Sequence, residues 1–167
     1  TRVKDEFSEY EHFLYGTYGK AAERLLFDLD HMLVGQTPPD LEGTDVSGKP
    51  VKLSDYRGKL LIVDFWQGSD PATHDHHGLK HILEKAGDRV AVVGIVSDSK
   101  EEVLQVVEKY NLTYPVFADG NRGPLFTQWN IHTWPTTFLL DDQGKILHRG
   151  QRGTTLEKIL VEKLVAE

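Results

Sequence analysis

The chain has 167 residues, of which 39% are hydrophobic and 27% charged, and this suits one compact globular domain with a helix or two appended. Its net charge of −7, without a basic stripe, argues against nucleic acid as a partner, and no apolar run approaches the roughly 20 residues of a membrane-spanning helix. It contains no cysteine, which excludes disulfides, thiolate nucleophiles, iron–sulfur clusters and thiolate zinc sites.

The first predicted element is a helix over residues 4–33, because apolar residues recur there at spacings of three or four. Gly16 and Gly19 fall in its middle, and each weakens a helix interior by about 1 kcal/mol relative to Ala. The pattern therefore predicts either a kinked helix or two shorter helices.

A domain boundary follows this helix, because Pro38 and Pro39 cannot continue it. We expect a helical extension over residues 1–34 and a main domain over residues 35–167. The apolar stripe of the extension needs a surface to cover. That surface is the main domain, a neighbouring domain or a second copy of the chain in a homo-oligomer.

The main domain alternates between short extended segments and amphipathic helices. The predicted elements are a hairpin of residues 41–44 and 51–53, a strand at 60–66, a helix at 71–86, a strand at 90–96, a helix at 100–110, a strand at 114–118, a helix at 124–129, a hairpin of 136–140 and 145–148, and a helix at 154–165. Such alternation, with an antiparallel hairpin near the end, predicts an α/β domain whose mixed sheet lies between layers of helices.

Three segments carry a family resemblance: residues 39–59, residues 63–66 and residues 134–145. In this order and spacing they resemble the redoxin group of the thioredoxin superfamily, which includes thiol-disulfide oxidoreductases of the TlpA-like type and peroxiredoxin-related proteins of the AhpC/TSA type. The resemblance implies a thioredoxin-like three-layer α/β/α sandwich with a mixed central sheet and an N-terminal β-hairpin. It also favours an extracytoplasmic, periplasmic location. Fold alone does not establish function.

The active-site motif of the family is changed. By the resemblance, its Cys-x-x-Cys falls on Asp70-Pro71-Ala72-Thr73, so both cysteines are absent. Asp70 would lie at the start of a helix, where Asp is a favoured N-cap and Pro a favoured first residue. We interpret the motif as a structural cap that cannot exchange thiols.

Two further positions follow from the same resemblance. Thr73 takes the place of the buried resolving cysteine, and Asp64 takes the place of the buried carboxylate that assists proton transfer to it. Burial would raise the pKa of Asp64, and the Thr73 hydroxyl could satisfy one of its oxygens. We interpret the two residues as a polar core pair, because the sequence offers no nucleophile for a new catalytic acid.

Pro135 matches the cis-proline of the family, and the residue before it, here Trp134, offers backbone hydrogen bonds to extended peptides in thioredoxin-like proteins. Thr133, Trp134 and Pro135 are therefore the predicted binding surface, with Trp66 expected nearby. Aromatic residues at such a surface can anchor a partner. An equally weighted alternative is that the tryptophans belong to the core.

Four histidines lie between residues 74 and 81. On a helix, His74, His77 and His81 would share one face, and with Asp70 they could hold zinc or another divalent ion and leave a position open for water. We favour a solvated helix face, because histidines at these spacings need no ligand. Metal binding here remains the alternative.

These observations predict a redox-inactive thioredoxin-like domain that binds a protein or a peptide and needs no cofactor. One alternative is a metal-binding domain or metal-dependent hydrolase that uses the face of His74, His77 and His81. Another is a protein classed with the thiol-disulfide oxidoreductases and redoxins through homology alone. An engineered cysteine-free oxidoreductase is disfavoured, because Asp and Thr are unusual replacements for Cys.

Overall fold

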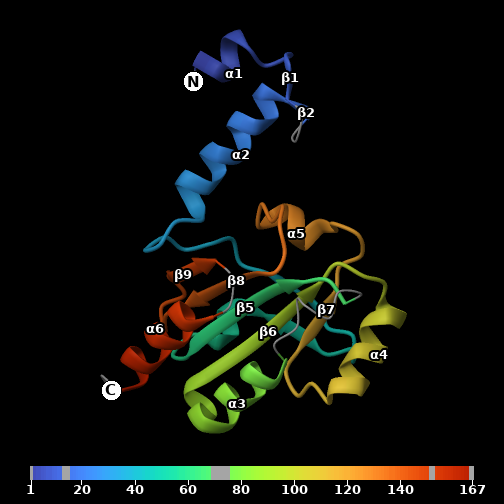
Figure 1. Ribbon diagram of the computed structural model, residues 1–167, viewed down its shortest axis with the longest axis vertical. Helices are drawn as coiled ribbons and strands as arrows, with labels where there is room; N and C mark the ends of the chain where they lie inside the picture. Colours follow the sequence, from blue (N-terminus) through green and yellow to red (C-terminus); the bar gives the residue numbers. More distant parts are fainter. Residues whose placement is uncertain (1, 13–15, 69–75, 151–152, 166–167) are drawn as a thin grey trace.

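A five-stranded mixed sheet forms the centre of the computed structural model, which describes residues 2–12, 16–68, 76–150 and 153–165 (Figure 1). The strand order is β7-β6-β5-β8-β9. The central strand β5 pairs in parallel with β6 and antiparallel with β8, so the sheet is mixed. The strands are β5 (Leu60–Trp66), β6 (Val90–Val96), β7 (Val116–Ala118), β8 (Thr136–Leu140) and β9 (Ile146–Gly150).

The central strand β5 is buried along its whole length. Its side chains alternate between two hydrophobic clusters on opposite faces of the sheet, with Phe65 in one cluster and Trp66 in the other. Because both faces are covered, the strand is apolar at every position except Asp64 instead of alternating between apolar and polar residues.

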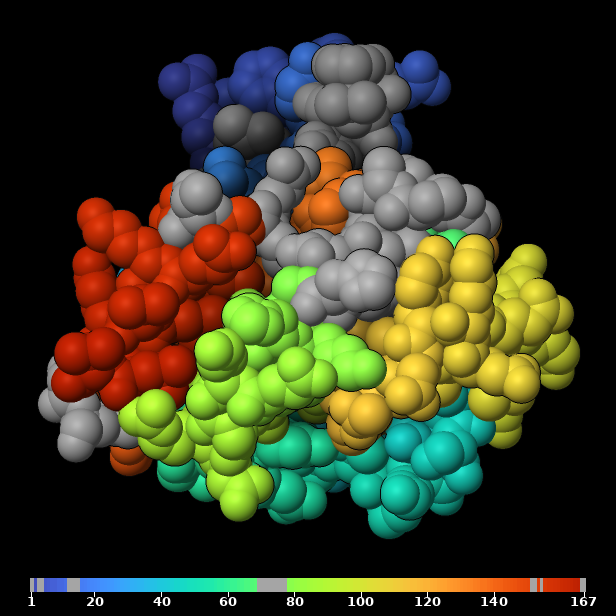
Figure 2. All heavy atoms as spheres, turned by 60° about the horizontal axis from the view of Figure 1, so that its bottom comes forward, coloured from blue at the N-terminus to red at the C-terminus, as the bar shows by residue number. Residues whose placement is uncertain are grey.

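Helices cover both faces of the sheet, as the sequence predicts. On one face lie α3 (His76–Ala86), α4 (Lys100–Tyr110) and α6 (Thr154–Val165), which appear side by side in green, yellow and red in Figure 2. On the other face lies the short helix α5 (Pro124–Gln128), whose Phe126 packs in the opposite cluster. Within the described part of the chain, no helix has the length and apolar character needed to cross a bilayer.

The hairpin that opens the main domain is confirmed. It pairs β3 (Glu42–Thr44) with β4 (Pro50–Lys52) and continues into a 3-10 turn at Leu53–Tyr56. The segment just before it covers the free edge of the sheet. There the Gly35 N–H donates to the carbonyl of Ile146 at 2.7 Å, and the Ile146 N–H donates to the carbonyl of Gln36 at 2.8 Å.

The N-terminal part is not one helix over residues 4–33 but, as the alternative prediction had it, two shorter helices, with an unpredicted hairpin between them. It consists of α1 (Arg2–Glu6), a two-stranded hairpin of β1 (Glu11–His12) and β2 (Gly16–Thr17), and α2 (Tyr18–His31). The chain breaks its helical path because Gly16 adopts a φ of +83° and the Thr17 hydroxyl caps α2 by accepting from the Lys20 N–H.

Gly19 has a packing role and does not kink the helix. A side-chain carbon at this position would lie 2.9 Å from the backbone oxygen of Ser8, so only glycine allows the two segments to meet. At the other end of α2, the Gln36 side chain donates to the Leu29 carbonyl at 2.6 Å and accepts from the Leu33 N–H at 2.8 Å. This side chain satisfies backbone groups that the end of a helix leaves without partners.

Candidate functional site at the cis-proline loop

The candidate site lies at the carboxyl-terminal ends of the central strands β5 and β6. Because β8 runs antiparallel to β5, its first residue, Thr136, lies opposite Phe65 near the end of β5. The Trp134–Pro135 peptide bond just before β8 is cis, which confirms the expectation from the resemblance. The topology therefore places the cis-proline loop beside the residues that follow the two central strands.

Trp134 is held in place on several sides. Its indole Nε1 donates a hydrogen bond to Gln67 Oε1 at 2.7 Å. The Arg122 guanidinium lies 5.2 Å from the centre of the ring, and the Phe126 ring packs edge-on at 5.7 Å. The half-buried indole is thus fixed by a hydrogen bond, a cation–π contact and an aromatic contact.

The ends of β5 and β6 are tied together beside this tryptophan. The backbone N–H of Gly68, which follows β5, donates to the carboxylate of Asp98, which follows β6. A side-chain carbon at Gly68 would lie 2.7 Å from the Asp98 Oδ2, so the glycine permits this close approach. Spacing along the chain gave no signal for this contact.

Asp64 is buried at 1% exposure, as its position in the family pattern implies. Its Oδ1 accepts a hydrogen bond of 2.7 Å from the hydroxyl of Thr137, which lies directly opposite on β8. Thr137 is itself completely buried. The expected partner, Thr73, lies outside the described residues, and Thr137 was missed because the register of β5 and β8 depends on the fold.

Trp66 does not belong to the binding surface, which corrects the expectation that it lies beside Trp134 there. It has no exposed surface and packs in the cluster beneath the helices α3, α4 and α6. Trp129 is also fully buried. Of the three tryptophans, only Trp134 is positioned to contact a partner, together with the exposed Thr133 and the half-buried Pro135.

The positions that would replace the active-site motif, Asp70 and Thr73, lie outside the described residues. The same holds for His74 and for the side chain of His77, whereas His81 is exposed on α3. Among the residues that the structure describes, no group of three potential metal ligands is present. The structure therefore tests neither the favoured solvated face nor the alternative of metal binding.

A groove runs beside the cis-proline loop and is formed by two adjoining cavities of about 400 and 410 Å³. The two cavities share three lining residues, Asn130, Ile131 and His132. Helix α2 forms one wall of this cis-proline groove, and the first cavity reaches α5 while the second reaches β9. Since Pro135 lines the second cavity, the groove is continuous with the loop.

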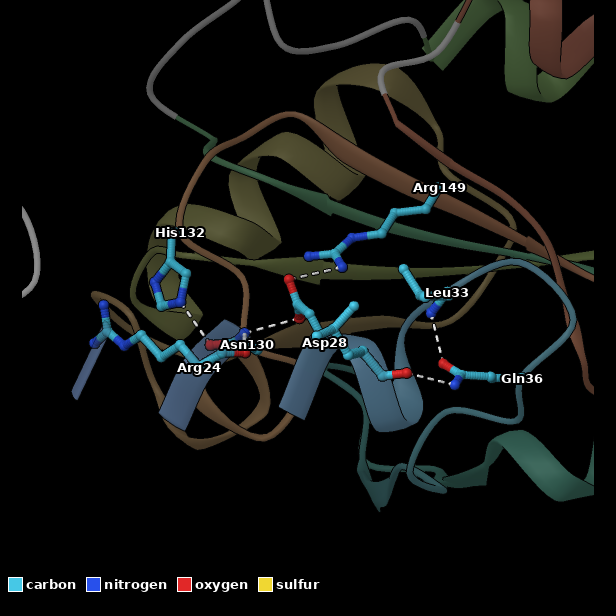
Figure 3. A network of polar contacts seen from close by, with 8 residues as sticks. Arg24, Asp28, Leu33, Gln36, Asn130, His132 and Arg149 are labelled. Atoms are coloured by element: carbon cyan, nitrogen blue, oxygen red, sulfur yellow. Dashed lines mark hydrogen bonds and ion pairs between the residues drawn. The ribbon is translucent and has the colours of Figure 1, made fainter. Parts of the chain in front are cut away.

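Asn130 organises the polar wall of the groove (Figure 3). Only 7% exposed, it donates to the carbonyl of Arg24 at 3.0 Å and to Asp28 Oδ1 at 2.8 Å. Its own Oδ1 lies 2.6 Å from His132 Nε2. Asp28 also pairs with Arg149 of β9 at 2.9 Å. These contacts attach α2 to the main domain, and no sequence motif indicated them.

The pKa of His132 is lowered in this setting, which favours the neutral ring. Burial lowers its pKa, the charges of Arg24, Arg122 and Arg149 lower it further, and Asp28 acts in the opposite direction. Because the Asn130 Oδ1 can only accept, the proton of the neutral ring is on Nε2. The histidine thus contributes a hydrogen bond to the groove wall without adding a charge.

The mixed sheet, the helices on its two faces and the cis-proline loop at the end of the central strands together define a thioredoxin-like protein. A comparison with family models narrows this class. The chain belongs to the AhpC/TSA family, whose model matches residues 34–149.

Individual relatives agree with this assignment. Thiol-disulfide oxidoreductase ResA of Geobacillus kaustophilus is 33% identical over 117 residues, which cover 68% of this chain and 66% of that protein. The thioredoxin-like protein YneN of Bacillus subtilis is 27% identical over 135 residues, 78% of either chain. Among solved structures, a thiol-disulfide oxidoreductase from Bacteroides fragilis superposes with a TM-score of 0.69 at 26% identity, covering 77% of this chain and 99% of that one.

Proposed function

We propose that this protein is a redox-inactive member of its family that binds a protein or an extended peptide at the cis-proline loop. The observation that carries the proposal is the absence of cysteine from all 167 residues. Thiol–disulfide exchange proceeds through attack by a thiolate, and no other side chain can replace it in that reaction. This chain therefore cannot carry out the thiol–disulfide exchange for which its relatives are named, although it retains the cis-proline loop.

The backbone at the loop supports peptide binding. Among the described residues, no hydrogen bond uses the backbone N–H or carbonyl of Trp134. Both groups are free to pair with an extended peptide, as an added strand pairs with the edge of a sheet. Because the Trp134 ring is already held by Gln67 and Arg122, little conformational freedom is lost when a peptide packs on it.

The groove supports the same function. It continues from Pro135 past His132, so a peptide bound at the loop has a path along the wall formed by α2. The resemblance to redoxins further leads us to place the protein outside the cytoplasm. Partners would then be proteins or peptides of that compartment.

The first prediction tests redox inactivity and the binding surface together. We expect no insulin reduction above the buffer control, even with an added thiol donor, because the chain has no thiol. Peptides selected by the full chain from a random phage-displayed library should bind the Trp134→Ala variant at least about tenfold more weakly, a loss of about 1.4 kcal/mol. Calorimetry provides the affinities.

A matched control is Tyr110→Ala, which removes an aromatic ring from the end of α4. It should leave the affinity unchanged, and near-ultraviolet circular dichroism should show that both variants fold. Insulin reduction above the control would overturn redox inactivity. Selected peptides that bind Trp134→Ala as tightly as the original chain would show that the binding surface lies elsewhere.

A further inference from the structure

The cis-proline groove differs in charge from the rest of the molecule. Arg24 and Arg122 line its first cavity and Arg149 lines its second, whereas the acidic lining residues are Glu23 and Asp28. The Asp28 carboxylate is already engaged by Arg149 and Asn130. A chain with a net charge of −7 thus gathers three guanidinium groups around one groove.

Arg122 is the guanidinium best placed to meet a ligand. It is exposed, and none of the ion pairs between described residues includes it. Its position is nevertheless fixed: the backbone, at a φ of 51°, donates to the Ser97 hydroxyl at 3.1 Å, and the side chain lies over Trp134. Arg122 is therefore a preorganised cation at the mouth of the groove.

The charges that act on His132 are also mainly positive. Three arginines lower the pKa of His132, and Asp28 alone among the acidic residues opposes them in the described part of the chain. A charged ligand that enters here meets a positive potential in partly desolvated surroundings, where charge–charge attraction is stronger than in bulk water.

We propose that the groove selects acidic peptides, with an Asp or Glu carboxylate of the peptide pairing with the guanidinium of Arg122. The Arg122 Cζ lies 5.2 Å from the centre of the Trp134 ring, and the guanidinium has no ion-pair partner among the described residues, so its N–H groups can donate to a carboxylate. The main chain of the peptide lies along Trp134 and Pro135. This inference rests on the proposed function, to which it adds the chemistry of the partner.

The test compares three fluorescein-labelled decapeptides with an Ala/Gly background and four Glu, four Gln or four Lys residues at the same positions. By fluorescence anisotropy, we expect the Glu peptide to bind the full chain at least about fivefold more tightly than the Gln peptide, and the Lys peptide to bind most weakly. Raising sodium chloride from 50 to 500 mM should reduce the advantage of the Glu peptide, because salt screens exposed charges.

Two substitutions separate the groove from general electrostatics. Arg122→Gln should abolish the difference between the Glu and Gln peptides. Lys109→Gln, which removes another cation held over an aromatic ring, that of Tyr110 at 5.0 Å, should preserve it. Both variants keep the backbone conformation unchanged in principle, and thermal melting checks that both fold.

Two outcomes would overturn the inference. Neither decides the proposed function, which the library experiment tests separately. If the Glu and Gln peptides bind equally, and both more weakly to Trp134→Ala, the loop binds peptides without selecting acidic ones. If none of the three peptides binds, the acidic selection is also wrong, and the library experiment decides separately whether the loop binds peptides at all.

Discussion

His132 shows how burial and nearby cations act on a single titratable residue. Its Nε2 lies 2.6 Å from Asn130 Oδ1, and burial together with the charges of nearby arginines lowers its pKa below the ordinary value near 6.5. The folded protein therefore binds a proton at this site less readily than the unfolded chain does. The associated stability is fully present above the unfolded pKa and is lost as the pH falls toward the folded one.

Because the pKa of His132 is lower in the folded state, we expect the unsubstituted protein to lose more unfolding free energy than His132→Gln when the pH is lowered from 7.5 to 5.5. Urea denaturation at the two pH values measures the difference. The comparison with the variant cancels the contributions of the other histidines and of the carboxylates. Equal losses in the two proteins would show that His132 does not titrate differently in the folded state.

The buried pair of Asp64 and Thr137 is the second feature at this scale. Thr137→Val keeps the volume but removes the hydroxyl that donates to the carboxylate. We expect it to lower the unfolding free energy by about 1–3 kcal/mol, the usual cost of removing one partner of a buried hydrogen bond. Thr137→Ser keeps the hydroxyl and should lose less. A smaller loss for Val than for Ser, in denaturant titrations, would contradict this role.

At the scale of elements, the contacts between α2 and the main domain determine the shape of the groove. The ion pair between Asp28 and Arg149 is about three-quarters buried, since the two side chains are 25% and 27% exposed. Asn130 adds hydrogen bonds to the Arg24 carbonyl and to Asp28 of the same helix. The groove wall therefore depends on contacts between residues more than 100 positions apart in the sequence.

Asp28→Ala should loosen this wall. We expect a fall of about 1 kcal/mol in unfolding free energy, because the pair is partly buried and Asn130 also loses a partner. Amide hydrogen exchange within α2 should become faster, whereas exchange in β5 should not. Glu42→Ala, which removes an exposed ion pair with Lys52, is the control and should change neither quantity measurably. Unchanged exchange in α2 would mean that other contacts hold the helix.

Helices and strands that are determined by neighbouring residues in the chain were predictable from the sequence. The strands at 60–66 and 90–96 match because long apolar, β-branched runs suit a strand covered on both faces. Helix α4 matches because Ser99 and Glu102 form a capping box and Asn111 ends the helix in a left-handed conformation. A single helix over residues 4–33 was wrong and the expected division into two shorter helices was confirmed, but the periodicity did not reveal the hairpin between α1 and α2.

Site residues could be predicted from the sequence only at the positions that belong to the family pattern. That pattern located the cis bond before Pro135 and the burial of Asp64. It gave no indication of Arg122, whose role depends on a cation–π contact with a residue 12 positions later, or of Asn130, whose partners are on α2. Contacts of this kind arise from tertiary placement, which a single sequence does not encode in any local spacing.

At the scale of the whole molecule, the charges are unevenly distributed. The chain carries 26 acidic and 19 basic residues, yet three of its arginines surround the groove. The acidic surface elsewhere keeps the chain apart from other acidic proteins in general. If the groove binds acidic segments as we propose, this charge distribution would favour selective over nonspecific binding.

The backbone pairing of Gly35 and Gln36 with Ile146 affects how the molecule meets its neighbours in solution. An outermost strand with free N–H and C=O groups is a template onto which another chain can stack, and such stacking leads to aggregation. The linker after α2 occupies these groups at the start of β9. The linker thus makes the start of this edge strand less available for pairing with another chain.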